Sequence, residues 1–202
     1  MQNPLTRLKF LLTATNHHGV HSPFIYGYAT KCLYAKREYC RGKSHNILFK
    51  SVAYFGAKRI GLPAGSENLQ AKLQAEFPSV HTEFTGVHTD LSTLKTELPS
   101  PEGGFPSRAT GPLYSQGQNG PFDILFAHPS QAKTILDRAS KENLVHNDTL
   151  LLVDAIHGNA TLLSLWKKIK NDPKVTVTVN LFHCGAVFFR REQAREHFKI
   201  RI

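Results

Sequence analysis

Two short apolar runs in the second half of the chain have the pattern of buried strands. Residues 122–127 (FDILFA) and 149–154 (TLLLVD) are almost wholly apolar, and each is followed by a helical pattern. Strands of a parallel sheet that is covered on both faces have this composition. Residues 175–181 then alternate strictly, and residues 186–190 follow after a glycine break, which is typical of an antiparallel hairpin at a sheet edge. The pattern predicts an α/β fold with a mostly parallel sheet that ends in this hairpin.

The first quarter of the chain shows helical patterns only. An apolar stripe over residues 4–16 predicts a first helix. A second helix is expected to begin at Ser22, which is followed by proline, because serine caps a helix and proline fits its first turn. A third helix is expected over 44–55. We therefore expect residues 1–56 to form an N-terminal helical cap beside the sheet.

An α/β domain is expected over residues 57–202. It begins with a strand at 59–62, a helix at 66–77 and a weaker β pattern at 80–84. Residues 99–121 are rich in Pro, Gly and Ser, which predicts a long flexible loop.

Composition and charge narrow the classes of partner. The 202 residues, 41% of them hydrophobic and 20% charged, are ordinary for one soluble domain, and no apolar run is long enough to span a bilayer. The net charge of +10 attracts phosphate groups. However, residues 190–201 interleave acids with bases, and nucleic-acid-binding motifs are not evident. These features favour a basic surface over a dedicated nucleic-acid site, which the charge alone leaves open.

The cysteines bear on the compartment. Cys32, Cys40 and Cys184 are odd in number and have no metal-ligand spacing, and the N-terminus lacks the pattern of a secretory signal. Free thiols suit a reducing environment, so we expect a cytoplasmic protein without a membrane partner. A homodimer remains open.

Several motifs carry a resemblance to a known family. They are HGVHSPF at 18–24, HND at 146–148, DAIH at 154–157 and the C-terminal stretch from 172 to 198. These segments resemble a divergent bacterial group of class I, Rossmann-like S-adenosylmethionine-dependent methyltransferases. The resemblance implies S-adenosylmethionine as cofactor and a small molecule as methyl acceptor.

The cofactor loop of that family is eroded in this chain. The resemblance implies an acid and then a glycine-rich turn after the first strand, because glycine lets the backbone approach the cofactor closely. Here Gly61 stands at the position of the acid, and Pro63 replaces the leading glycine. Gly65 and Ser66 can still form a turn before the next helix, although such turns are common in α/β proteins.

Two further cofactor positions follow from the resemblance. An acid at the end of the second strand would bind the ribose hydroxyls, and Glu83 is the candidate, with Asp90 as the fallback. After the strand at 122–127 the family places an Asp-Gly pair, whereas this chain has His128-Pro129. A neutral imidazole offers one donor and one acceptor, so His128 is a base at the site, a soft-metal ligand together with Asp154 and His157, or a surface histidine.

Asp154 and His157 are the candidate catalytic residues. The carboxyl ends of parallel strands open onto the ligand crevice, so Asp154 is expected to face the methyl acceptor. With His157 oriented by this carboxylate, the pair would act as a general base. The alternative is structural, with Asp154 capping the next helix and His157 packing on it. Because Ala155 replaces a second acid of the family, we expect no metal site.

The N-terminal histidines His17, His18 and His21 either cover the cleft as a lid or belong to a helix start. Two functions from different classes therefore remain. The first is a small-molecule methyltransferase, and the second is a catalytically inactive relative that serves as a binding or scaffold protein. A nucleic-acid-binding module that uses the basic cap is a third.

Overall fold

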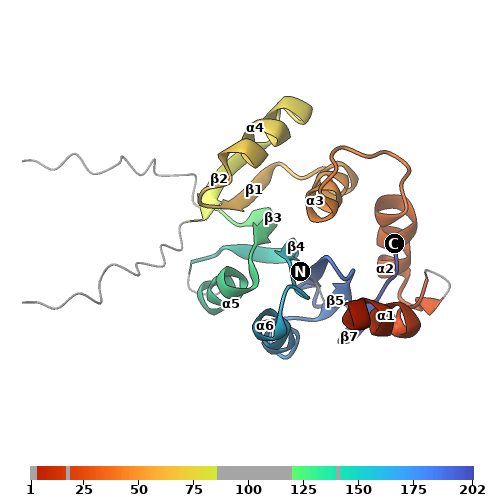
Figure 1. The fold of residues 1–202 in the computed structure, drawn as a ribbon. Coiled ribbons are helices and arrows are strands. Elements are labelled where there is room, and N and C mark those ends of the chain that lie inside the picture. The colour runs from red at the N-terminus through yellow and green to blue at the C-terminus, as the bar shows by residue number, and fades with distance from the viewer. Residues whose placement is uncertain (1–3, 17–18, 86–119, 140–141) are drawn as a thin grey trace, which may run out of the picture.

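The computed structural model describes residues 4–16, 19–85, 120–139 and 142–202. Within them lies one seven-stranded sheet with the order β2-β1-β3-β4-β6-β5-β7 (Figure 1). Its strands are β1 (Arg59–Pro63), β2 (His81–Thr85), β3 (Phe122–Ala127), β4 (Val145–Asp154), β5 (Val177–Asn180), β6 (Cys184–Phe188) and β7 (Glu196–Lys199). The helices are α1 (Pro4–Thr13), α2 (Pro23–Tyr28), the π-helical segment η2 (Ala29–Leu33), α3 (Lys43–Phe55), α4 (Glu67–Glu76), α5 (Pro129–Arg138) and α6 (Ala160–Lys170).

Strand directions confirm the predicted α/β class. Strands β2, β1, β3 and β4 run parallel to one another, and β6 pairs antiparallel with both β4 and β5. The predicted hairpin is thus present, and its second strand is inserted between β4 and β5. The basic tail, expected to be a solvated surface, continues the sheet as β7, which pairs in parallel with β5.

Local signals account for several element ends. The Ser22 side chain accepts a hydrogen bond from the Ile25 amide at the start of α2, as the Ser-Pro pair predicts. Helix α3 ends at Gly56, which has a φ of 60° that glycine adopts without strain. The Asn159 side chain caps α6 by accepting from the Leu162 amide.

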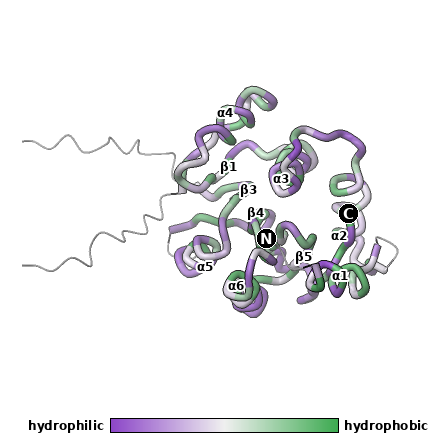
Figure 2. The backbone as a smooth tube through the Cα atoms, viewed as in Figure 1, coloured by the Kyte–Doolittle hydropathy of each residue, from purple (hydrophilic) through white to green (hydrophobic). Residues whose placement is uncertain are grey.

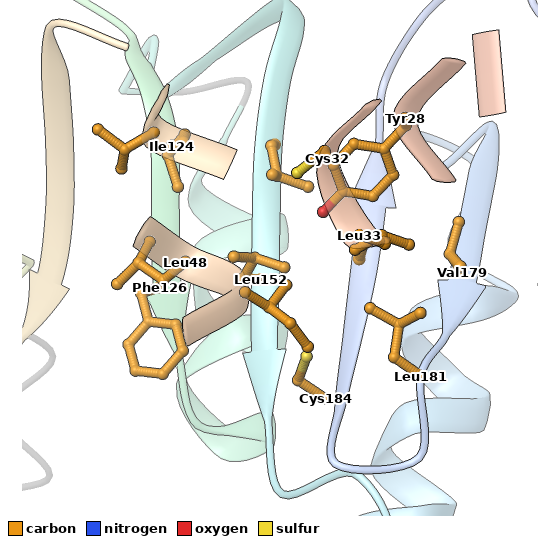
Figure 3. Close-up of a cluster of buried hydrophobic side chains, with 14 of the residues drawn as sticks. Tyr28, Cys32, Leu33, Leu48, Ile124, Phe126, Leu152, Val179, Leu181 and Cys184 are labelled. Carbon is orange, nitrogen blue, oxygen red and sulfur yellow. The ribbon is translucent and has the colours of Figure 1, made fainter. Parts of the chain in front are cut away.

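Two hydrophobic clusters lie on opposite faces of the sheet. On one face, side chains such as Leu48 of α3 pack with Phe126, Leu152 and Cys184 of the sheet (Figure 3). On the other face, α5 and α6 cover β3, β4 and β6, and the buried Trp166 belongs to this cluster. Figure 1 shows α3 and α4 on one side of the sheet and α5 and α6 on the other. The N-terminal helices α2 and α3 therefore share one core with the sheet.

Buried hydrogen bonds join the helices of this cap. The hydroxyl groups of Tyr28 and Ser51 lie 3.0 Å apart, and Ser51 also donates to the Ile47 carbonyl at 2.8 Å. Burial raises the pKa of the nearby Cys32 thiol to about 12, so this cysteine stays protonated. All three cysteines are free.

Helix α1 lies apart from these helices, at the β7 edge of the sheet. Thr15 bridges to Ile200, and the Thr15 amide donates to the Lys199 carbonyl at 2.9 Å. Hydrophobic residues of α1 stand beside hydrophilic ones (Figure 2), and Leu5, Leu8 and Leu12 are exposed. The packing of α1 on the sheet edge therefore rests mainly on Phe10, which is buried.

The expected loop over 99–121 lies outside the described residues except at its last two positions. His17, His18 and Asp90 also lie outside them. Among the helices that the structure describes, none is long and apolar enough to cross a membrane.

Candidate functional site

The order of the strands predicts a ligand crevice at the carboxyl ends of β1 and β3. The chain goes from β1 to β2 in one direction and returns to β3 on the other side of β1. In open α/β sheets, ligands bind where the strand order reverses in this way. The residues that follow these strands, together with Asp154 at the end of β4, form the candidate site.

The turn after β1 has the backbone that the sequence predicts. Gly65 has a φ of 82°, and the space around its Cα is open, so a ligand can approach the backbone there. The Ser66 hydroxyl donates to the Pro63 carbonyl at 2.5 Å, and the Ser66 carbonyl accepts from the Leu69 and Gln70 amides. Ser66 thus starts α4 directly beneath the turn.

Gly61 lies inside β1 and not in this turn. A Cβ atom at Gly61 would lie 2.5 Å from Leu125 Cδ2 and 2.8 Å from Thr85 Cγ2. The glycine is therefore explained by close packing on the sheet face, and its role as a cofactor contact stays a prediction.

Glu83 is held by a cation in the middle of β2. Its carboxylate accepts from Arg59 Nη2 at 2.8 Å and lies 3.2 Å from His81 Nε2. The Arg59 guanidinium also stacks over the Phe122 ring at 5.0 Å. A ribose that used Glu83 would have to compete with this ion pair.

His128 begins α5 at the end of β3. Its amide donates to Gln131 Oε1 at 3.2 Å, its Nδ1 lies 3.0 Å from Ser130 Oγ, and its side chain is exposed. Both contacts belong to the start of its own helix. The imidazole is therefore accessible to solvent at the carboxyl end of β3.

Asp154 ends β4 and does not cap the following helix, since Asn159 does so. Its carboxylate accepts from the Ala155 amide at 2.7 Å. The same amide donates to the His183 carbonyl at 2.9 Å, and Ala155 has a φ of 51°. Left-handed backbone is unfavourable for alanine, and such strained positions often lie at functional sites. The turn after β4 thus holds the carboxylate beside the β5–β6 hairpin.

His157 contacts a different part of the molecule. Its Nε2 lies 3.0 Å from Asn180 Nδ2, or 3.3 Å from Asn180 Oδ1, and its ring stacks on Phe182 at 5.0 Å. The Phe10 ring meets it edge-on at 5.9 Å. Burial lowers the pKa of His157, and the Lys199 charge lowers it further, whereas the Asn180 contact raises it. The structure records no hydrogen bond between His157 and Asp154 among the described residues.

His183 is the imidazole that the sequence reasoning missed. It lies in the turn between β5 and β6, and its carbonyl accepts from the Ala155 amide. Burial and the charges of Lys43 and Arg7 lower its pKa, whereas Asp154 raises it, so carboxylate and imidazole interact electrostatically. No local signal identifies His183, because only the insertion of β6 beside β4 brings this turn to the end of β4.

Helix α3 also reaches this edge. The His45 ring meets Phe126 edge-on at 5.5 Å, and the Ser44 hydroxyl donates to the His183 carbonyl at 3.5 Å. In the described part of the chain, no group of three or more His, Cys, Asp or Glu residues could hold a metal ion. The candidate site therefore consists of a glycine turn, one carboxylate and several imidazoles.

Comparisons with protein families, curated proteins and solved structures found no match to this chain.

Proposed function

We propose that this chain is an S-adenosylmethionine-dependent methyltransferase that acts on a small-molecule acceptor. The observation that carries the proposal is the Gly65 turn, which lies at the point where the strand order reverses. The motif resemblance indicates the cofactor, and the inserted antiparallel strand β6 agrees with the fold that it implies. Alignment of the methyl group with the acceptor would supply most of the catalysis.

In this proposal, Asp154 faces the acceptor and orients a base. The imidazole that it affects electrostatically is that of His183. A neutral imidazole oriented by a carboxylate would accept a proton from the hydroxyl or amine of the acceptor as the methyl group is transferred. His157 stays the base that the sequence predicts, so both imidazoles are candidates.

Two observations favour the second candidate function, a catalytically inactive binding or scaffold protein. Glu83 is occupied by Arg59, and Pro63 offers no amide proton where the family has glycine. Both features would weaken the binding of the ribose and amino-acid parts of the cofactor.

Calorimetric titration with S-adenosylmethionine and S-adenosylhomocysteine tests the proposal. We expect saturable heat and a rise in the unfolding midpoint, because a ligand at 100 times its Kd stabilises the native state by about 2.7 kcal/mol. If neither heat nor stabilisation appears at about millimolar ligand, the inactive protein is the correct description.

Gly65→Ala and Gly56→Ala form a matched pair for this titration. Both glycines have positive φ, and neither would place a Cβ within 4 Å of another residue, so both substitutions should cost about 1 kcal/mol of stability. Gly56 ends α3, away from the crevice. We expect only Gly65→Ala to weaken S-adenosylhomocysteine binding. Equal affinities of the two variants would show that the turn does not contact the cofactor.

A further inference from the structure

A second cavity lies outside the crevice, at the β7 edge of the sheet. It has a volume of about 570 Å³ and is bounded by α1, α6 and the ends of β5 and β7. A volume of this size accommodates a small molecule. Gly65, Ser66, His128 and Asp154 do not line it, whereas His157 does, so the cavity shares one residue with the candidate site described above.

Part of the lining of this cavity is apolar. It includes Trp166 and Leu163 of α6 and Phe10 of α1, and Trp166 is only 2% exposed. Leu5 also lines the cavity and is 71% exposed. An aliphatic or aromatic body placed here would bury apolar surface on both the ligand and these side chains.

Four lysines give the rest of the cavity lining a positive charge. Lys9, Lys167, Lys170 and Lys199 line the cavity, and acidic side chains are not among its lining residues in the described chain. None of the four forms an ion pair with a described residue. Burial and the charge of Lys199 lower the pKa of Lys170, so the positive charges repel each other.

The dipole at the C-terminus of α6 explains only part of this positive charge. Basic residues in the last turn of α6 are favoured by its dipole, which accounts for Lys167 and Lys170. Lys9 comes from α1 and Lys199 from β7, so tertiary packing brings them to the same place. A bound anion would relieve the repulsion among them.

Two neutral polar groups stand beside the lysines. Asn180 and His157 both line the cavity and contact each other, and the ring of His157 is fixed by stacking on Phe182. Burial keeps His157 neutral by lowering its pKa. These groups can accept or donate a hydrogen bond without adding charge.

We propose that this cavity binds a small amphipathic anion, a carboxylate or phosphate group carried on an apolar chain or ring. The anionic group lies between Lys170 and Lys199, and the apolar body lies along Phe10, Leu163 and Trp166. His157, predicted as a catalytic base, contributes in this arrangement to the wall of the cavity.

Decanoate, below its micelle concentration, is the probe for this site. Trp166 is the single tryptophan of the chain and lines the cavity, so its fluorescence reports occupancy directly. We expect a saturable change in emission and a higher unfolding midpoint with decanoate. Decanol, with the same chain length and no charge, should bind about tenfold more weakly or worse. Equal binding of the two would overturn the proposal.

Lysine variants locate the anionic group. Lys170→Met and Lys199→Met keep an apolar stem, and each should weaken decanoate binding by about tenfold. Lys168→Met is the matched control, because Lys168 is exposed on the same helix and does not line the cavity. Far-ultraviolet circular dichroism verifies the fold of each variant. If Lys168→Met weakens binding as much as Lys170→Met, the effect is general surface charge and the proposal fails.

Vesicles distinguish the small ligand from a membrane surface. Exposed Leu5, Leu8 and Leu12 beside lysines would also suit an anionic bilayer. Sedimentation with vesicles that contain phosphatidylserine, combined with no response to decanoate, would replace the cavity ligand by membrane binding. Binding of decanoate that persists without vesicle association supports the proposal.

Discussion

At the scale of single residues, Asp154 affects the two candidate imidazoles differently. The sequence places His157 three residues after the carboxylate, whereas the fold brings the β5–β6 turn, which carries His183, to the end of β4. Asp154 raises the pKa of His183 and is not among the causes that shift His157. The electrostatic effect of Asp154 on His183 therefore comes from tertiary structure.

The substitution Asp154→Asn separates the two imidazoles. It removes the charge and keeps the shape, so we expect the pKa of His183 to fall and that of His157 to stay unchanged. Titration of both rings by nuclear magnetic resonance measures this, with His81 on β2 as a distant reference. A larger shift at His157 than at His183 would restore the pair that the sequence predicts.

At the scale of elements, the contact between α6 and β6 depends on a glycine. Gly185 pairs with Val153 and Asn180 in the sheet, and a Cβ atom there would lie 2.4 Å from Trp166 Cη2. The Trp166 ring is buried between helix and sheet, so it has little room to move. Because Gly185 has no side chain, the Trp166 ring can pack directly against the backbone of β6.

We expect Gly185→Ala to lower the free energy of unfolding by about 1–3 kcal/mol, since overpacking forces the ring or the backbone to shift. Urea unfolding measures the loss. In a Trp166→Phe background the loss should be smaller, because residues in contact do not contribute additively. Gly27→Ala on α2, whose Cβ would lie 3.3 Å from Tyr54 Oη, serves as control and should be neutral or slightly stabilising. A Gly185→Ala variant as stable as the parent protein would refute this packing argument.

At the scale of the whole molecule, three histidines that are partly shielded from solvent set the pH dependence. Burial lowers the pKa of His157, His183 and His197 from the ordinary value of 6.5. Below pH 6.5 these histidines bind more protons in the unfolded chain than in the folded protein. The folded state is thus favoured fully above about pH 6.5 and loses stability as the pH falls toward the lowered pKa values.

We therefore expect the free energy of unfolding to decrease between about pH 7 and pH 5. The slope should correspond to the uptake of at most about three protons on unfolding, one for each histidine. Asp123 acts in the same direction at lower pH: burial raises its pKa, but hydrogen bonds from the Arg59 and Lys58 amides and from His146 outweigh this and lower it. Urea titrations at several pH values test the profile. His197→Gln should reduce the slope, and a stability that is independent of pH over this range would contradict the assignment.

Much of the element pattern was predictable from local sequence. The strands expected over 122–127 and 149–154 and the helices expected over 44–55 and 66–77 agree with the observed elements within a few residues. Strand β7 was not recognised, because four residues with alternate burial among charged neighbours do not differ from a solvated tail. Only pairing with β5 makes them a strand.

The positions of some candidate-site residues were also predictable from local sequence. Gly65 and Asp154 lie at strand ends, and strand ends of a parallel sheet meet at one edge whatever the details of packing. Glu83 was expected at the end of β2 but lies inside the strand, where Arg59 pairs with it. The partners of charged side chains depend on neighbouring strands, which a single sequence does not reveal.

The sequence by itself determined the α/β class, the hairpin and the positions of the turn glycine and the strand-end carboxylate, because these follow from apolar periodicity and backbone preference. The tertiary structure alone decided the order of the strands, the approach of His183 to Asp154 and the gathering of four lysines around one cavity. Such contacts join residues far apart in the chain, and their energy depends on distances that only the packed fold sets.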